Sequence, residues 1–202
     1  MDTASQGHEA RQPDHPVERF ILERWSPRAF DGSAIPEEDL ATIFEAARWA
    51  PSAFNAQPWR FVYVRRGDCE WERLLGLLIP FNASWAKNAG VLIFICSDGL
   101  IEMKPGQMPE PSHTHSFDAG AAWAMLALQA TALGYHAHGM SGVDFERARL
   151  ELAVPERFRV EAAVAIGKKG DKSLLPEKLR GREGPSKRKP LDQLVFRSRF
   201  PA

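Results

Sequence analysis

The chain has 202 residues, of which 44% are hydrophobic and 26% charged, a balance typical of a globular protein with one domain and its own core. Its formal net charge of zero excludes a global attraction to nucleic acid or membrane surfaces, although residues 168–199 hold eleven Lys and Arg against four Asp and Glu. No apolar run approaches the roughly 20 residues that span a bilayer, so no membrane association is expected.

The start of the chain and its two cysteines indicate where the protein works. Residues 1–15 are polar and of mixed charge, unlike a secretory signal, and are expected to form a disordered lead-in to a single domain over 16–202. Cys69 and Cys96 lack the paired spacing of a zinc site or a disulfide framework. Cys96 ends an apolar run and should be buried. These features predict a cytoplasmic protein.

Apolar periodicity predicts alternating helices and strands. The expected helices cover 16–24, 36–50, 69–79, 83–88, 117–133 and 144–153, and the expected strands cover 60–66, 90–97, 135–140 and 159–166. Gly134 suits the end of the long Ala- and Leu-rich helix, and Asp144 suits the cap of the next one. Because this order is not a strict βαβ repeat, it predicts an α+β sandwich. The common dinucleotide-binding fingerprint is also missing, since no Gly-x-Gly-x-x-Gly follows the first strand.

Three further features of the pattern bear on the site. Residues 99–115 contain three prolines and little periodicity, which predicts a long loop that forms a lid or binding loop. Residues 168–202 predict an extended basic segment with little core of its own, either solvated or reaching a phosphate. The helix over 117–133 is apolar on nearly all sides, so it should be buried, in part by another subunit.

The loop over residues 24–28, Arg-Trp-Ser-Pro-Arg, places two arginines around a hydroxyl. The planar fork of arginine suits phosphate, and a serine hydroxyl can join it. The alternative is a pair of ordinary surface arginines.

The loop over residues 50–61 is fixed by two prolines and holds Ser52, Asn55 and Gln57. Amide side chains offer both donors and acceptors, which suit a ring edge with carbonyls and an N–H, such as the pyrimidine of a flavin. The alternative is a capped turn. Trp59 and Phe61 are expected in the core.

The third segment, residues 134–144, follows the long helix. Gly139 and Gly142 let the backbone approach a flat ligand closely. His136 and His138 alternate as a metal pair would, but no third ligand lies at suitable spacing, so ordinary hydrogen bonds from a strand are the favoured interpretation.

Together these segments resemble the nitroreductase family of FMN-dependent oxidoreductases, over about residues 24–195. The most specific part is Ala50-Pro51-Ser52 with Asn55 and Gln57-Pro58-Trp59. Arg24-x-Ser26-x-Arg28 resembles the family's opening phosphate loop. The helix that ends at Gly134, the stretch Gly139-Met140-Ser141-Gly142 and the basic run from Lys187 to Leu191 follow in the family's order.

The resemblance implies a nitroreductase-like α/β sandwich whose central, mixed and mainly antiparallel sheet is flanked by helices. It also implies a homodimer with FMN at the subunit interface and with the C-terminal segment extending onto the partner subunit. Trp25 and Pro27 depart from the usual opening loop, and residues 99–115 match no family lid.

The resemblance assigns roles to particular residues. The phosphate and ribityl chain of FMN would be held by the opening loop and the late basic pair, and the flavin ring by the other segments, some of them from the neighbouring subunit. A backbone N–H of Ser141 or Gly142 would lie near flavin N5 and stabilise the reduced flavin. The residues expected to bind FMN are Arg24, Trp25, Ser26, Arg28, Pro51, Ser52, Asn55, Gln57, Asn82, Gly139, Met140, Ser141, Gly142, Lys187 and Arg188.

The implied activity is ping-pong transfer of hydride from NADH or NADPH through the flavin to a small electron-poor acceptor, such as a nitroaromatic, a quinone or an enone. Two alternatives keep the flavin: oxygen-dependent chemistry on the same fold, and a non-catalytic flavin-binding or sensory module. A nucleic-acid binder with a basic tail has the least support, and no metal is expected.

Overall fold

An unbroken run of eight buried residues, β2 (Val91–Asp98), forms the centre of the sheet. β2 pairs with β1 (Trp59–Arg65) on one side and with β6 (Phe158–Gly167) on the other, and β6 pairs with β5 (His136–Met140). The order is therefore β1-β2-β6-β5, with every pair antiparallel over the described residues. This confirms the prediction that residues 90–97 form a strand buried on both faces.

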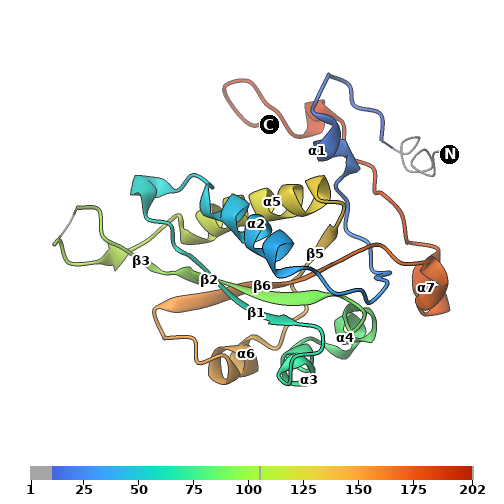
Figure 1. Cartoon of the computed structure of the whole chain (residues 1–202). Coiled ribbons are helices and arrows are strands. Elements are labelled where there is room, and N and C mark those ends of the chain that lie inside the picture. Colours follow the sequence, from blue (N-terminus) through green and yellow to red (C-terminus); the bar gives the residue numbers. More distant parts are fainter. Residues whose placement is uncertain (1–10, 105, 202) are drawn as a thin grey trace.

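The computed structural model describes residues 11–104 and 106–201 (Figure 1). A small hairpin joins β3 (Leu100–Ile101) to β4 (Glu110–Pro111). The helices are α1 (Arg19–Glu23), α2 (Glu37–Arg48), α3 (Trp71–Leu75), α4 (Pro80–Ala86), α5 (His115–Ala132), α6 (Phe145–Glu151) and α7 (Glu177–Arg180), with 3-10 turns η2 (Ala53–Asn55), η3 (Lys172–Leu174) and η4 (Leu191–Gln193).

Helices cover both faces of the sheet, as Figure 1 shows. Successive side chains of a strand point to opposite faces, so Ile93 and Ile95 pack with α2 and α5, whereas Leu92 and Phe94 pack with α3, α4 and α6. Trp59 is buried in the α2 and α5 layer, and Phe61 packs against it. The α+β sandwich is thus confirmed.

Several element boundaries differ from the predicted ones for local reasons. α4 begins at Pro80 rather than Ala83, because proline fits the first helical turn. The helix predicted over 69–79 is short, since Leu78 leaves it to form a bridge with Val143. α1 is likewise confined to Arg19–Glu23.

The chain after β6 was expected to add little core, and among its described residues only Leu175 and Leu179 are buried. Leu175 and Leu179 are buried in the same cluster as Trp85 and Phe94, below the sheet. The loop predicted over 99–115 is also not wholly irregular, because it contains the β3–β4 hairpin and ends where α5 begins.

α5 is buried on one face only in this single chain. Leu126 and Ala122 are fully buried beneath it, whereas Phe117 is 79% exposed and Met125 38%. Gly134 follows with a φ of +80°, the left-handed conformation expected at the end of a helix. Within the described ranges, no helix is long and apolar enough to cross a membrane.

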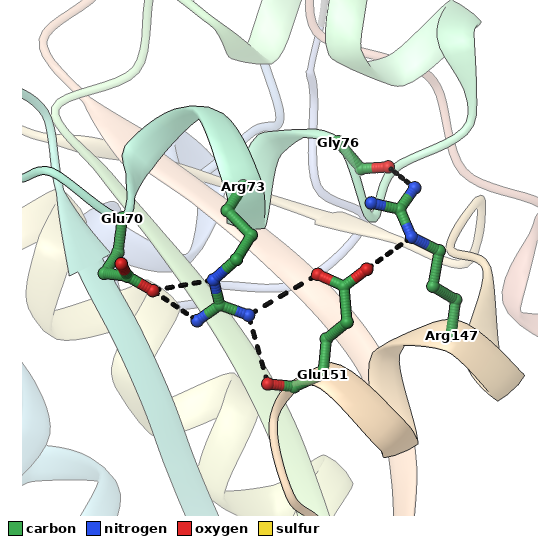
Figure 2. Close-up of polar contacts among 5 residues, drawn as sticks. All are labelled: Glu70, Arg73, Gly76, Arg147 and Glu151. Carbon is green, nitrogen blue, oxygen red and sulfur yellow. Dashed lines mark hydrogen bonds and ion pairs between the residues drawn. The ribbon is translucent and has the colours of Figure 1, made fainter.

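An ion-pair network joins α3 to α6 (Figure 2). The Glu151 carboxylate accepts from Arg147 at 2.5 Å and from Arg73 at 3.5 Å, and Arg73 also pairs with Glu70. Arg147 donates to the Gly76 carbonyl at 2.9 Å. The network therefore ties α6 to α3 and to the turn that follows α3.

We expect Leu126→Ala to lower the free energy of unfolding by about 2–5 kcal/mol, because it leaves a cavity under α5. Leu150→Ala is the matched control, since Leu150 is 69% exposed on α6, and it should change stability by about 0.5 kcal/mol or less. Urea unfolding of both variants measures the difference, and equal losses would contradict the described packing of α5.

Candidate functional site

A groove of about 660 Å³ runs between α5 and the edge of the sheet formed by β5 and β6. Its volume falls within the roughly 300–1,000 Å³ of small-molecule sites. Its walls are mainly apolar. The lining residues are Arg24, Ser26, Ile95, Ser116, Ala119, Gly120, Trp123, Ala124, Ala127, Leu128, Gly139, Met140, Ser141, Glu161, Ala162 and Val164.

The opening loop is fixed to the sheet from both sides. The Pro27 carbonyl lies 2.8 Å from Nδ1 of His138, which is consistent with an Nδ1–H donor. Phe30 forms an antiparallel bridge with Lys169, just after β6. These contacts place Arg24 at the groove wall.

The same loop is held by a carboxylate that no motif indicated. Glu183 Oε1 accepts from the backbone N–H groups of Arg28 at 2.7 Å and Ala29 at 2.8 Å. Nε of Arg28 is buried and has no hydrogen-bond partner among the described residues. A buried donor without a partner is costly, so an acceptor from a ligand would be favourable there.

Three guanidinium groups gather beside the groove. Burial lowers the pKa of Arg24, and the nearby charge of Arg188 lowers it further. Burial also lowers the pKa of Arg11, followed by the charges of Arg188 and Arg24. Arg24 in addition donates to Ser26 Oγ at 3.3 Å. Because like charges repel, this cluster would be stabilised by a bound anion.

The loop after β5 is held away from the groove on one side. The Gly142 carbonyl accepts from the Ile79 N–H at 3.1 Å and from Asn82 Nδ2 at 3.1 Å. A Cβ at position 142 would collide with Asn82 and lie 2.6 Å from Ile79 Cδ1. Asn82 is therefore a buried support of this loop and does not line the groove.

Gly139 and Gly142 were expected to let the backbone approach a flat ligand, but the space that a Cβ would occupy at each of them lies against protein atoms. At Gly139 a Cβ would lie 3.2 Å from the Trp123 ring, and at Gly142 the space is filled by Asn82. Gly139, Met140 and Ser141 still line the groove, whereas Gly142 does not.

The loop over residues 51–57 stands apart from this chain's groove, because none of its residues lines it. Phe54, Asn55 and Gln57 have φ angles of 51°, 55° and 48°, which are left-handed values that residues other than glycine rarely adopt. Strain of this kind concentrates at functional sites. Pro51 and Asn55 are exposed.

The strained loop is fastened to α5 and to itself. Asp118, only 4% exposed, accepts from the Ala53 N–H at 3.2 Å and from the Thr114 hydroxyl at 3.1 Å. Ser52 Oγ accepts from the Gln57 N–H at 3.0 Å. Asp118 holds the loop in its conformation, and an acidic residue within an apolar helix is the signal that could have found it.

The strand histidines support the opening loop, and the described residues contain no group of three or more His, Cys, Asp or Glu side chains that could hold a metal ion. His138 packs on Trp85 with ring centroids 4.6 Å apart, and His136 meets Trp25 edge-on at 5.9 Å. Burial lowers the pKa of His138 and lowers that of His136 to about 4, with Lys169 and then Arg24 adding to the latter shift.

A polar group that sequence reasoning missed lies farther along the groove. Glu161 lies on β6 beyond Ala163, the residue that pairs with the last residue of β5. Its Oε1 accepts from the hydroxyls of Ser97 at 2.6 Å and Ser116 at 2.7 Å, and Ser97 Oγ lies 2.7 Å from His115 Nδ1. The groove thus has a cation at one end and a carboxylate at the other.

The structure brings together part of the predicted set. Five predicted residues line the groove, namely Arg24, Ser26, Gly139, Met140 and Ser141. Arg188 lies near Arg24 on the exposed tail that also carries Lys187. Sequence reasoning missed four contributors, Arg11, Asp118, Glu161 and Glu183. Arg11 lies in residues 1–15, which were expected to be disordered. The first ten of these residues lie outside the described ranges.

We expect stability to depend on pH through His136. The folded protein keeps this ring neutral down to about pH 4, whereas the unfolded chain protonates it below about 6.5. The unfolded state therefore binds the additional proton between these values, and the free energy of unfolding falls across that window by on the order of 3 kcal/mol.

Urea unfolding of the parent and of His136→Gln at pH 7 and pH 4.5 checks this expectation. The parent should lose more stability on acidification than the variant, and identical losses in the two proteins would contradict a neutral, buried His136.

Comparison with known proteins gives a consistent result. The family model described as the nitroreductase family matches residues 21–81 and 78–168. A crystal structure described as an oxidoreductase containing FMN is 53% identical, covers 95% of this chain and 96% of its own, and superposes with a TM-score of 0.91.

Two more distant relatives agree. A protein from Desulfovibrio desulfuricans, assigned as a nitroreductase and solved in complex with FMN, is 28% identical, with a TM-score of 0.71 and coverage of 94% of this chain and 100% of that one. An NADH dehydrogenase from Thermus thermophilus is 30% identical over 93% of this chain and 98% of its own length. The chain belongs to the nitroreductase family.

Proposed function

We propose that the chain binds FMN in the groove along α5 and acts as an NAD(P)H-dependent oxidoreductase. The observation that carries this proposal is the guanidinium cluster at the end of an apolar groove in a nitroreductase fold. Both solved structures described above contain FMN, and the Thermus relative is named an NADH dehydrogenase.

The phosphate of FMN fits the cationic end of the groove. Arg24 and Ser26 supply a guanidinium fork and a hydroxyl at the wall, and Arg188 adds charge from the tail. The dianion would offset both the burial and the repulsion from Arg188 that lower the pKa of Arg24. The buried Nε of Arg28, which has no partner in the described ranges, is a further donor available to the cofactor.

The ring system fits the apolar part of the groove. Trp123, Met140 and Val164 provide flat apolar surface, and Ser141 follows the last paired residue of β5. We assign the backbone N–H of Ser141, rather than that of Gly142, as the donor toward flavin N5, because Ser141 lines the groove and Gly142 does not. FMN, when bound, supplies the hydride chemistry. The protein orients the ring and excludes water.

The groove is open on one side, and a second copy of the chain would close it. The strained loop 51–57 carries Ser52, Asn55 and Gln57 without contact to its own groove, so in a homodimer it would reach the flavin of the partner. Large exposed apolar side chains suit such an interface, including Phe54 at 71% and Phe117 at 79% exposure. The C-terminal segment after Lys187 would extend onto the partner.

The acceptor would be small and electron-poor, such as a nitroaromatic, a quinone or an enone, and would take the place of the nicotinamide after it leaves. This shared position makes the mechanism ping-pong. No side chain has to act as a nucleophile, because the reacting groups belong to the cofactor and the two substrates.

Anaerobic titration of the FMN-loaded protein with NADH and NADPH tests the function. We expect the visible flavin bands to bleach with at least one nucleotide and to return when a quinone or nitroaromatic is added. Initial rates should give parallel double-reciprocal lines. A flavin that stays oxidised with both nucleotides would overturn the proposed activity and leave only a flavin-binding protein.

We expect Arg28→Ala to weaken FMN binding by about 1.5–3 kcal/mol, because it removes the charged donor proposed to bind the cofactor. Fluorescence-quenching titration with FMN measures the change. Arg182→Ala is the matched control, since it removes the same charge from an exposed arginine, whereas Nε of Arg28 is buried. Equal affinity of the parent and Arg28→Ala would place the cofactor contact elsewhere.

A further inference from the structure

Arg11, well before the first helix, connects two distant parts of the chain. Its Nη1 donates to the carbonyls of Leu22 at 2.9 Å and Arg24 at 2.5 Å, and its Nε donates to the carbonyl of Ser186 at 3.3 Å. One guanidinium therefore joins the end of α1 to a tail segment 175 residues away in sequence.

The tail segment that Arg11 holds is the one that carries Arg188. Arg188 Nη1 donates to Ser186 Oγ at 2.8 Å and to the Ser186 carbonyl at 3.2 Å. The carbonyl of Ser186 thus accepts from both arginines. Residues 182–190 contain no helix or strand and are mostly exposed, and Glu183 is bound to the opening loop five residues before Arg188, so Ser186 is the contact nearest to Arg188 that joins this segment to Arg11.

We propose that Arg11 is a positioning residue of the anion site, which holds the tail at Ser186 so that Arg188 and Arg24 face the same phosphate. This inference rests on the proposed binding of FMN. The hydrogen bonds of Arg11 act against electrostatic repulsion, because the side chains of Arg11, Arg24 and Arg188 are all positively charged. Without its hydrogen bonds, the exposed tail would move away from Arg24, and the phosphate would lose one of its cations.

The geometry of the guanidinium is needed for this role. Arginine presents several donors in a rigid fork and can bind carbonyls on two segments at once, whereas the single ammonium of lysine is a compact point charge. A substitution that keeps the charge but loses the fork therefore separates positioning from simple electrostatic attraction.

The experiment compares the affinities of the full-length protein for FMN and for riboflavin, which lacks the phosphate, by fluorescence-quenching titration. The variants are Arg11→Ala, Arg11→Lys and Arg19→Ala. Arg19 is the control, because it lies on α1 with its side chain 72% exposed, pairs with Glu23, and loses the same charge when replaced. Thermal unfolding of each variant reports whether the fold is retained.

We expect Arg11→Ala to bind FMN about tenfold to a hundredfold more weakly while its affinity for riboflavin is unchanged. The affinity of Arg11→Lys for FMN should be closer to that of Arg11→Ala than to that of the parent, and Arg19→Ala should bind FMN as tightly as the parent. This pattern places the effect of Arg11 on the phosphate end of the ligand.

Three results would overturn the inference alone: unchanged FMN affinity in Arg11→Ala, equal weakening of FMN and riboflavin, or full recovery in Arg11→Lys. A parent protein that binds neither flavin would instead overturn the proposed function, and this inference with it.

Discussion

Repulsion among the guanidinium groups of Arg11, Arg24 and Arg188 is the constraint on which the site depends. Burial and then the neighbouring positive charges lower the pKa values of Arg11 and Arg24, so the rest of the molecule must hold the three groups together. Hydrogen bonds of Arg11 to backbone carbonyls, and of Glu183 to the backbone of Arg28, supply part of that restraint. An anion bound between the three guanidinium groups would remove this repulsion, and the free energy gained would favour binding of the anion.

The sheet provides the rigid frame for this arrangement. β2 is buried along its whole length, and its two faces anchor the helical layers on either side. β5 then carries His138, which contacts the opening loop through Pro27, and ends where the groove-lining Ser141 begins. In the proposed mode of FMN binding, the positions of the phosphate and of the flavin ring would therefore both depend on a single edge strand.

The sequence predicted those features that local patterns encode. The apolar run from Val91 and the long helix before Gly134 were expected and are present, as was the Asp144 cap, which accepts from the Arg147 N–H. Of the opening loop, Arg24 and Ser26 line the groove, and Arg24 lies beside two other arginines; their role in binding a phosphate stays a prediction.

Other features depend on contacts between distant residues, which no local pattern encodes. Arg11 contacts Ser186, 175 residues away, and Glu183 contacts Arg28, 155 residues away. Leu175 and Leu179 lie in a segment that was expected to add little core because it is mostly polar, yet both are buried. The roles of Asn55 and Gln57 remain a proposal, because in the described chain their loop does not contact its own groove.

A crystal structure of the protein with FMN would test the central claim most directly. The account predicts that the phosphate lies within hydrogen-bonding distance of the side chains of Arg24 and Arg188, with the ring along the groove beside Ser141. A phosphate bound away from these arginines, or a flavin outside the groove, would contradict it.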